Sequence, residues 1–263
     1  MVTPFGNPQN IYLYSYFHVE LGEFLMTMAM PFLLSVAGII FAPWFMTRRG
    51  AAEDEGVSTQ PQQGTPGEDV LAPSASTAML DRRRLAVYAP LFAIALLAIF
   101  RAVPFGIAVI IVFVALLILD RDALLKVDYP LLATFLCFFI FAGNMARIPV
   151  LEEVLQPLMG QWGLLTSALT SQVISNVPAA VLLSHFTDVW QPLLIGVNIG
   201  GAGTFVGSLA SLIAIRHFAI ARTMIPRLRE PDALDTASFL RLFGTVNGAF
   251  FVALLVICQL ALG

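Results

Sequence analysis

Two polar segments interrupt apolar stretches of the chain and carry residue types that can bind ions. The first is centred on residues 175–178 and the second covers residues 200–208; both combine hydroxyl or amide side chains with Pro or Gly. A helix that restarts at a Pro exposes backbone N–H groups to an anion. The candidate binding residues are Ser175, Asn176, Val177, Pro178, Gly200, Gly203, Thr204, Gly207 and Ser208. A candidate Na⁺ would take its neutral oxygens from Ser175, Asn176, Thr204 and Ser208.

The composition indicates what must surround these segments. The chain has 263 residues, of which 58% are hydrophobic and 12% charged, whereas soluble domains carry about 25% charged residues. This predicts an all-α polytopic membrane protein with roughly seven or eight membrane segments. In hydrocarbon, polar backbone breaks survive only where they face protein or a wet cavity. The two polar segments are therefore expected in the protein interior.

Several function classes are disfavoured by the sequence. It has no P-loop motif for nucleotides and no basic, aromatic-interleaved stretch for nucleic acid. Cys137 and Cys258 lie in apolar spans and match no metal or disulfide pattern. We therefore expect neither an enzyme nor a bound cofactor or metal, apart from a coupling ion.

Apolar periodicity and composition divide the chain into spans and connections. Residues 48–84 are rich in Gly, Pro, Ser, Gln and charged residues and are predicted to form a disordered cytoplasmic linker. Residues 146–160 are predicted to be an interfacial connection. The predicted full spans are 24–46, 85–100, 105–119, 130–145 and 239–262.

The basic residues test this topology. If the linker is cytoplasmic and 162–186 returns to its own side, Arg101 and Arg147 are the two basic residues outside, so 12 of the 14 lie inside. A crossing at 162–186 would instead place a five-Arg loop outside. The count therefore predicts a re-entrant hairpin at 162–186, a broken helix at 190–215, and a periplasmic or extracellular C-terminus.

An internal repeat accompanies the second polar segment. Residues 3–11 and 204–212 share the pattern Thr-x-x-Gly-(Asn/Ser)-x-x-(Asn/Ser)-aliphatic. Each copy precedes an apolar half-helix and a span that begins with a Phe-Leu pair, at Phe24 and Phe239. Because the two spans are predicted to run in opposite directions, the pattern indicates an inverted-repeat transporter fold.

The repeat predicts a division of the chain and further site residues. Residues 1–47 would be the end of an incomplete first repeat and 85–263 the second repeat, so the chain is expected to begin partway through the first. The pseudo-symmetric site candidates in the first copy are Gly6, Asn7 and Asn10.

These motifs resemble the ion transporter superfamily, and in particular its citrate transporter-like or anion permease branch, related to divalent anion:sodium symporters and arsenite pump membrane proteins. The residues that carry the resemblance are Gly6-Asn7-Pro8-Gln9-Asn10 and Ser175-Asn176-Val177-Pro178-Ala179-Ala180. The symporters have a Ser-Asn-Thr hairpin tip, whereas Val177 follows Asn176 here. The resemblance implies that the hairpin tip and the broken helix together hold a cation and the substrate.

By this resemblance, the expected function is secondary active transport of a small anion, such as a carboxylate, across the cell (inner) membrane. The resemblance also implies a homodimer in the lipid bilayer. The middles of the predicted spans lack carboxylates and His, which favours Na⁺ over H⁺ as the coupling ion and leaves both open. The alternatives are an arsenite or metalloid efflux permease and a non-transporting, truncated membrane fragment.

Overall fold

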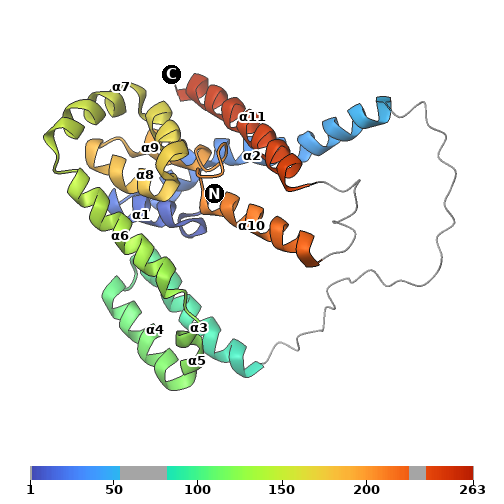
Figure 1. The fold of residues 1–263 in the computed structure, drawn as a ribbon. Helices are drawn as coiled ribbons and strands as arrows, with labels where there is room; N and C mark the ends of the chain where they lie inside the picture. Colours follow the sequence, from blue (N-terminus) through green and yellow to red (C-terminus); the bar gives the residue numbers. More distant parts are fainter. Residues whose placement is uncertain (1, 54–81, 225–234, 263) are drawn as a thin grey trace, which may run out of the picture. The chain divides into compact units, whose positions relative to one another are not determined.

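The computed structural model describes residues 2–53, 82–224 and 235–262. Within these ranges the secondary structure is helical without strands (Figure 1), which confirms the predicted all-α class. In chain order the helices are η1 (Pro4–Gly6), α1 (Pro8–Tyr16), α2 (Leu21–Glu53), α3 (Arg82–Ile99), α4 (Phe105–Leu119), α5 (Arg121–Leu125), α6 (Tyr129–Met145), α7 (Pro149–Ile174), α8 (Asn176–Leu183), η2 (Ser184–Phe186), α9 (Trp190–Ile199), α10 (Leu209–Met224) and α11 (Thr236–Leu262).

Long apolar helices make this a polytopic membrane protein. α2 over Leu21–Phe41 and α11 over Thr236–Ala261 are each long and apolar enough to cross a bilayer alone. Leu85–Ile99 and Phe105–Leu119 are shorter apolar helices that coincide with predicted spans. On α4, Phe105 and Ile118 are 71% and 72% exposed, as expected for side chains that face lipid.

Helix ends differ from the prediction around the expected linker. α2 continues to Glu53 and α3 begins at Arg82, so helices include the first and last residues of the predicted linker 48–84. Its remainder, 54–81, lies outside the described residues. The long apolar run of α2 favours continuation of the helix because each added residue adds a backbone hydrogen bond once the helix is nucleated.

The predicted interfacial connection 146–160 is helical from Pro149 onward. α6 and α7 meet at an angle of 95°, and Pro149 occupies the first turn of α7, where its missing N–H costs no hydrogen bond. α7 is itself kinked at Trp162, whose backbone is not helical (φ −133°, ψ 39°). The Leu158 carbonyl accepts a hydrogen bond from the Thr166 hydroxyl at 3.3 Å beside this kink.

The chain forms two compact units, 42–129 and the remainder. In the smaller unit, α3 packs against α4, and the Tyr88 hydroxyl donates to Asp120 Oδ2 at 2.5 Å. Asp120 also caps α5, since its Oδ1 accepts the Ala123 N–H at 3.2 Å. Both polar segments lie in the larger unit.

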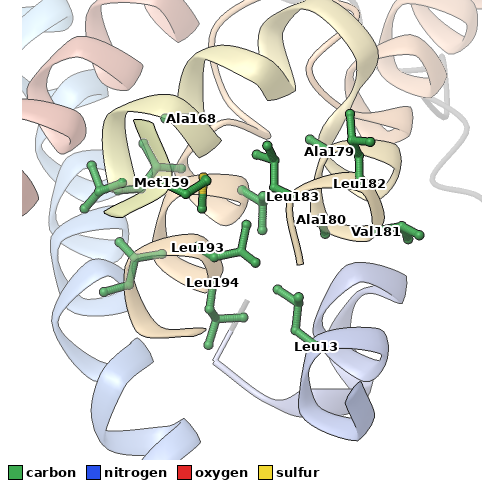
Figure 2. Close-up of a cluster of buried hydrophobic side chains, with 14 of the residues drawn as sticks. Leu13, Met159, Ala168, Ala179, Ala180, Val181, Leu182, Leu183, Leu193 and Leu194 are labelled. Carbon is green, nitrogen blue, oxygen red and sulfur yellow. The ribbon is translucent and has the colours of Figure 1, made fainter. Parts of the chain in front are cut away.

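The core of the larger unit surrounds α8 and α9. Every residue of α8 is buried, as is α9 from Leu193 to Ile199. Figure 2 shows Leu13 of α1 directed toward this cluster, together with Met159 and Ala168 of α7. A helix that is apolar on all sides is stable in the centre of a fold. The two polar breaks adjoin α8 and α9 in sequence, so they lie next to the most buried helices.

Candidate functional site

α7 and α9 approach each other closely along a seam of small residues. A Cβ on each glycine of the seam would lie 2.5–3.3 Å from the opposite side chain, so the seam has no room for larger residues. From one facing pair to the next, the residue number rises by four on α7 and also by four on α9, so the two helices run parallel. The pairs are Gly163–Pro192, Ser167–Gly196 and Ser171–Gly200.

This parallel packing determines the path of the chain between the two helices. Because α7 and α9 run in the same direction, α8 and the residues after it must carry the chain back. α8 packs against both helices (Figure 1), so the chain folds back on itself after Ile174, while its predicted return to one side of the membrane stays a prediction. The break after Ile174 and the break after Ile199 consequently lie at the same level.

The hairpin tip is a strained serine. Ser175 has φ 72° and ψ 156°, a region of backbone conformation that is essentially restricted to glycine and costs of order 1–3 kcal/mol. Its N–H donates to Ser171 O and its carbonyl accepts the Ala179 N–H, both at 3.1 Å. Pro178 follows in the first turn of α8, as predicted. A role of the Ser175 hydroxyl in binding stays a prediction.

The tip contacts the loop that separates α9 from α10. The Asn176 N–H donates to Gly207 O at 3.0 Å. Asn176 Nδ2 lies 3.2 Å from the position that a Cβ on Gly201 would occupy, and Ser208 Cβ lies 3.7 Å from the same point. The structure therefore brings the two predicted polar segments together.

Three glycines of the loop are explained by packing within the protein. A Cβ on Gly200 would lie 2.5 Å from Ser171 Cβ, and one on Gly207 would lie 2.6 Å from the Gly200 carbonyl oxygen. Gly203 has φ +103°, and its Cβ would lie 2.5 Å from Gln172 Oε1. Close packing thus explains why these positions are glycines, and their predicted role in ion binding stays a prediction.

The two loop hydroxyls have partners inside the protein. Thr204 Oγ1 donates to the Gln172 carbonyl at 3.1 Å, and the Thr204 N–H donates to Gln172 Oε1 at 2.8 Å. Ser208 Oγ accepts the Ser211 N–H at 3.3 Å and so caps α10. Thr204 therefore ties the loop to α7, and Ser208 starts the helix that follows.

Asn10, in the first copy of the repeat, contacts Asn198 of α9, which precedes the second copy. Asn10 is fully buried, accepts the Asn198 Nδ2 hydrogen bond at 2.7 Å and donates to Thr3 O at 3.2 Å. Gly6 and Asn7 form the local turn before α1: the Gly6 N–H donates to Thr3 O, and Asn7 O accepts the Ile11 N–H. Among the first-copy candidates, Asn10 is the residue that the structure joins to α9.

Asn198 is a weaker candidate from the sequence, with capping of a half-helix as the alternative, and it is not part of the predicted site. Asn198 is 7% exposed; its Nδ2 donates to Leu194 O at 2.9 Å, and its Oδ1 is buried without a hydrogen-bond partner. The carbonyl partner fixes the amide orientation because a carbonyl oxygen can only accept. An orphaned buried acceptor costs about 1–3 kcal/mol, so this position fits a cation or a hydrogen-bond donor. The feature of the sequence that could have indicated Asn198 is an amide side chain two residues before the glycine-rich loop.

Gln172 is a second missed residue. Its side-chain amide joins the last turn of α7 to the loop, with Nε2 donating to Gly200 O at 2.7 Å and to Ala202 O at 3.1 Å. The sequence signal is again an amide in an apolar run, three residues before Ser175.

The buried polar side chains of the described residues are neutral. They are Gln9, Asn10, Ser35, Ser167, Ser171, Asn176, Ser184, Asn198, Ser208 and Ser211. Amide and hydroxyl oxygens can hold a cation by ion–dipole contacts, whereas intramembrane proton relays use carboxylates or His.

Comparison with known proteins identifies the family. A family model described as citrate transporter matches residues 1–188. The uncharacterized transporter MJ0456 of Methanocaldococcus jannaschii is 31% identical over 215 residues, which is 82% of this chain and 53% of that protein. The inner membrane protein YbiR of Escherichia coli is 39% identical over 112 residues, which is 41% of this chain and 30% of that protein.

The chain thus spans about half the length of the first of these relatives and less than a third of the second. No solved structure matches it. The family match includes the first-copy turn, the hairpin tip and all of α8. The chain therefore belongs to the citrate transporter family and is an integral membrane protein.

Proposed function

We propose that this chain is part of a secondary active transporter that moves a small anion, such as a carboxylate, across the cell (inner) membrane. The observation that carries the proposal is the contact between the hairpin tip and the broken helix, where the Asn176 N–H donates to Gly207 O at 3.0 Å. Transporters with broken helices bind substrate and coupling ion where such breaks meet. Membership of the citrate transporter family supports the same function.

The tip and the loop offer different chemistry to an anion and a cation. The first turn of α8 begins at the tip, where the positive end of the helix dipole favours an anion, although the Asn176 N–H already donates to Gly207 O. Ser175 Oγ, Asn176 Oδ1 and the orphaned Asn198 Oδ1 are neutral oxygens suited to Na⁺. Because the buried polar side chains of the described residues are neutral, we favour Na⁺ over H⁺ as the coupling ion.

An inverted repeat would provide the two states of alternating access. The Gly6 N–H donates to Thr3 O and the Gly207 N–H donates to Thr204 O, both at 3.1 Å, so the two predicted copies share one turn geometry. The Asn10–Asn198 bond joins the first copy to α9, the helix before the second copy. This supports a mechanism in which one repeat moves against the other around the bound ion.

The test is uptake by the protein in proteoliposomes. A panel of radiolabelled anions that includes citrate is offered with and without an inward sodium gradient. Asn176→Ala should lower gradient-driven uptake at least about tenfold, equivalent to about 1.4 kcal/mol. Asn247→Ala is the matched control because the Asn247 amide donates within its own helix, to Phe243 O, and it should retain uptake.

Two results would contradict the proposal. Full uptake by Asn176→Ala at normal membrane abundance would exclude the tip from the site. Transport of arsenite without sodium dependence would favour the metalloid efflux alternative.

A further inference from the structure

Gln172 replaces the backbone hydrogen bonds that are lost where the helix breaks. Its Nε2 lies 2.7 Å from Gly200 O, 3.1 Å from Ala202 O and 3.3 Å from Ala168 O. Its Oε1 accepts the Thr204 N–H at 2.8 Å. One side chain thus binds both acceptors and a donor of the loop, across 28 to 32 residues of sequence.

An uncharged amide is the side-chain type that this position requires. The end of a helix leaves carbonyl groups without partners, and at membrane depth water cannot supply them. Two loop carbonyls need a donor and the Thr204 N–H needs an acceptor. Asn and Gln provide both functions at neutral charge, whereas an ionised Glu only accepts and a Lys only donates.

The loop is shaped around this amide. A Cβ on Gly203 would lie 2.5 Å from Gln172 Oε1, and one on Gly207 would lie 3.3 Å from the same atom. Gly203 also has a positive φ of 103°, which glycine adopts without strain. The glycines of the loop therefore allow the backbone to close around the Gln172 side chain.

We infer that Gln172 is a positioning residue of the site: it holds the loop 200–204 against α7, level with the hairpin tip. The inference deepens the proposed function and rests on it, because this loop is the broken-helix part of the proposed site. Gln172 also occupies the carbonyl oxygens of Gly200 and Ala202.

The test is hydrogen exchange of the loop, measured by mass spectrometry on the reconstituted protein. Gln172→Met keeps the volume and removes every side-chain hydrogen bond. Since each bond contributes about 1 kcal/mol, amides of residues 200–206 should exchange at least about tenfold faster. Gln259→Met is the matched control: Gln259 lies in α11 and its Oε1 has no hydrogen-bond partner. Loop exchange should be unchanged in this variant.

A second variant separates hydrogen bonding from space filling. Gln172→Glu keeps the acceptor for Thr204, and when protonated it regains a donor for one loop carbonyl. After correction for intrinsic exchange, its loop should become more protected as the pH is lowered, and that of Gln172→Met should not. If Gln172→Met does not fold, the pH dependence of loop exchange in Gln172→Glu still tests the inference. Two results would overturn the inference. One is a loop exchange rate in Gln172→Met that equals that of the wild-type protein. The other is a loop exchange rate that is the same in the Glu and Met variants at every pH.

Binding of ²²Na⁺ by the same samples links the loop to the proposed site. The half-saturating Na⁺ concentration should rise at least about tenfold in Gln172→Met and stay unchanged in Gln259→Met. An unchanged concentration in Gln172→Met, with a loosened loop, would overturn the link between loop position and ion binding. Failure of the wild-type protein to bind Na⁺ would contradict the proposed coupling ion, while the exchange data would still decide whether Gln172 holds the loop.

Discussion

The two copies of the repeated segment share a backbone turn and differ in what their side chains contact. In both, a Gly N–H donates to a Thr carbonyl at 3.1 Å, and a helix begins two residues after the Gly, at Pro8 or at Leu209. Asn10 of the first copy reaches Asn198, whereas Ser211, its counterpart in the second, contacts neighbouring Ser208. The turn thus depends on neighbouring residues, whereas the hydrogen bond between the first copy and α9 depends on the Asn10 side chain.

The helices that follow explain this difference. α1 packs against α8 and α9, in the core, whereas α10 packs against α11. Asn10 is therefore surrounded by helices of the second repeat and has a partner there. A polar side chain in such a place must find a hydrogen bond, because an unpaired polar group there is costly. Substitutions at three pairs of matched positions test the comparison.

The largest effect is expected at Asn10 and Ser211. Asn10→Ala removes the acceptor for Asn198 Nδ2 and leaves a cavity, so it should lower the free energy of unfolding by about 2–3 kcal/mol. Ser211→Ala should change it by less than about 0.5 kcal/mol, because the α10 cap uses the Ser211 backbone N–H. Unfolding by SDS titration, followed by tryptophan fluorescence, measures both. Equal losses of unfolding free energy in the two variants would contradict the proposed difference between Asn10 and Ser211.

A smaller effect is expected at the residues that start the two half-helices. Ser208 caps α10 through its side chain, whereas Asn7 makes no side-chain cap bond to α1. Ser208→Ala should therefore cost about 1 kcal/mol of unfolding free energy, and Asn7→Ala less than about 0.5 kcal/mol. The same titration compares them, and a larger loss in Asn7→Ala would contradict this account of the turns.

The smallest effect is expected at the start of the two long spans. The Phe24 N–H donates to Glu20 O and the Phe239 N–H donates to Asp235 O, at 3.0 and 2.9 Å. Asp235 also accepts the Ser238 N–H through Oδ1 at 2.9 Å; within the described residues Glu20 shows no such side-chain cap. Hydrogen bonds from Ser238 lower the pKa of Asp235 below its ordinary value of 3.8.

The sign of the pH effect follows from this lowered pKa. A carboxylate whose pKa is lower in the folded state stabilises the fold above its unfolded pKa, and this contribution is lost as the pH falls through the folded value. Amides 236–239 at the start of α11 should therefore exchange faster below about pH 4, after correction for intrinsic rates. Asp235→Asn, which keeps an acceptor and does not titrate, should lack this acceleration. An identical pH response in that variant would show that Asp235 titration is not its cause.

Local features could be predicted from the sequence because they depend on neighbouring residues. The breaks at Ser175 and after Ile199 follow from polar, Pro and Gly residues within apolar runs, and the structure has both. The turn shared by 3–11 and 204–212 follows from the spacing of Thr and Gly. Whether these segments bind an anion and Na⁺ stays a prediction.

The roles of individual residues could not be predicted in the same way. Gly200, Gly203 and Gly207 were predicted to bind an ion, which stays a prediction, and the structure adds that they pack closely against Ser171, Gln172 and the loop backbone. Asn198 and Gln172 were not selected, because an isolated amide in an apolar run does not reveal its partner. Their partners lie 188 and up to 32 residues away, and only the packing of α1, α7 and α9 brings them together.

The sequence by itself therefore determined the all-α membrane class, the positions of the helix breaks and the repeated turn, since these depend on composition and on hydrogen bonds between near neighbours. The tertiary structure decided which polar groups meet. The parallel α7–α9 seam sets the two breaks at one level, and Gln172 can reach the loop only because glycine and serine let those helices approach closely. Contacts of this kind depend on helix orientation and distance, which no short sequence pattern specifies.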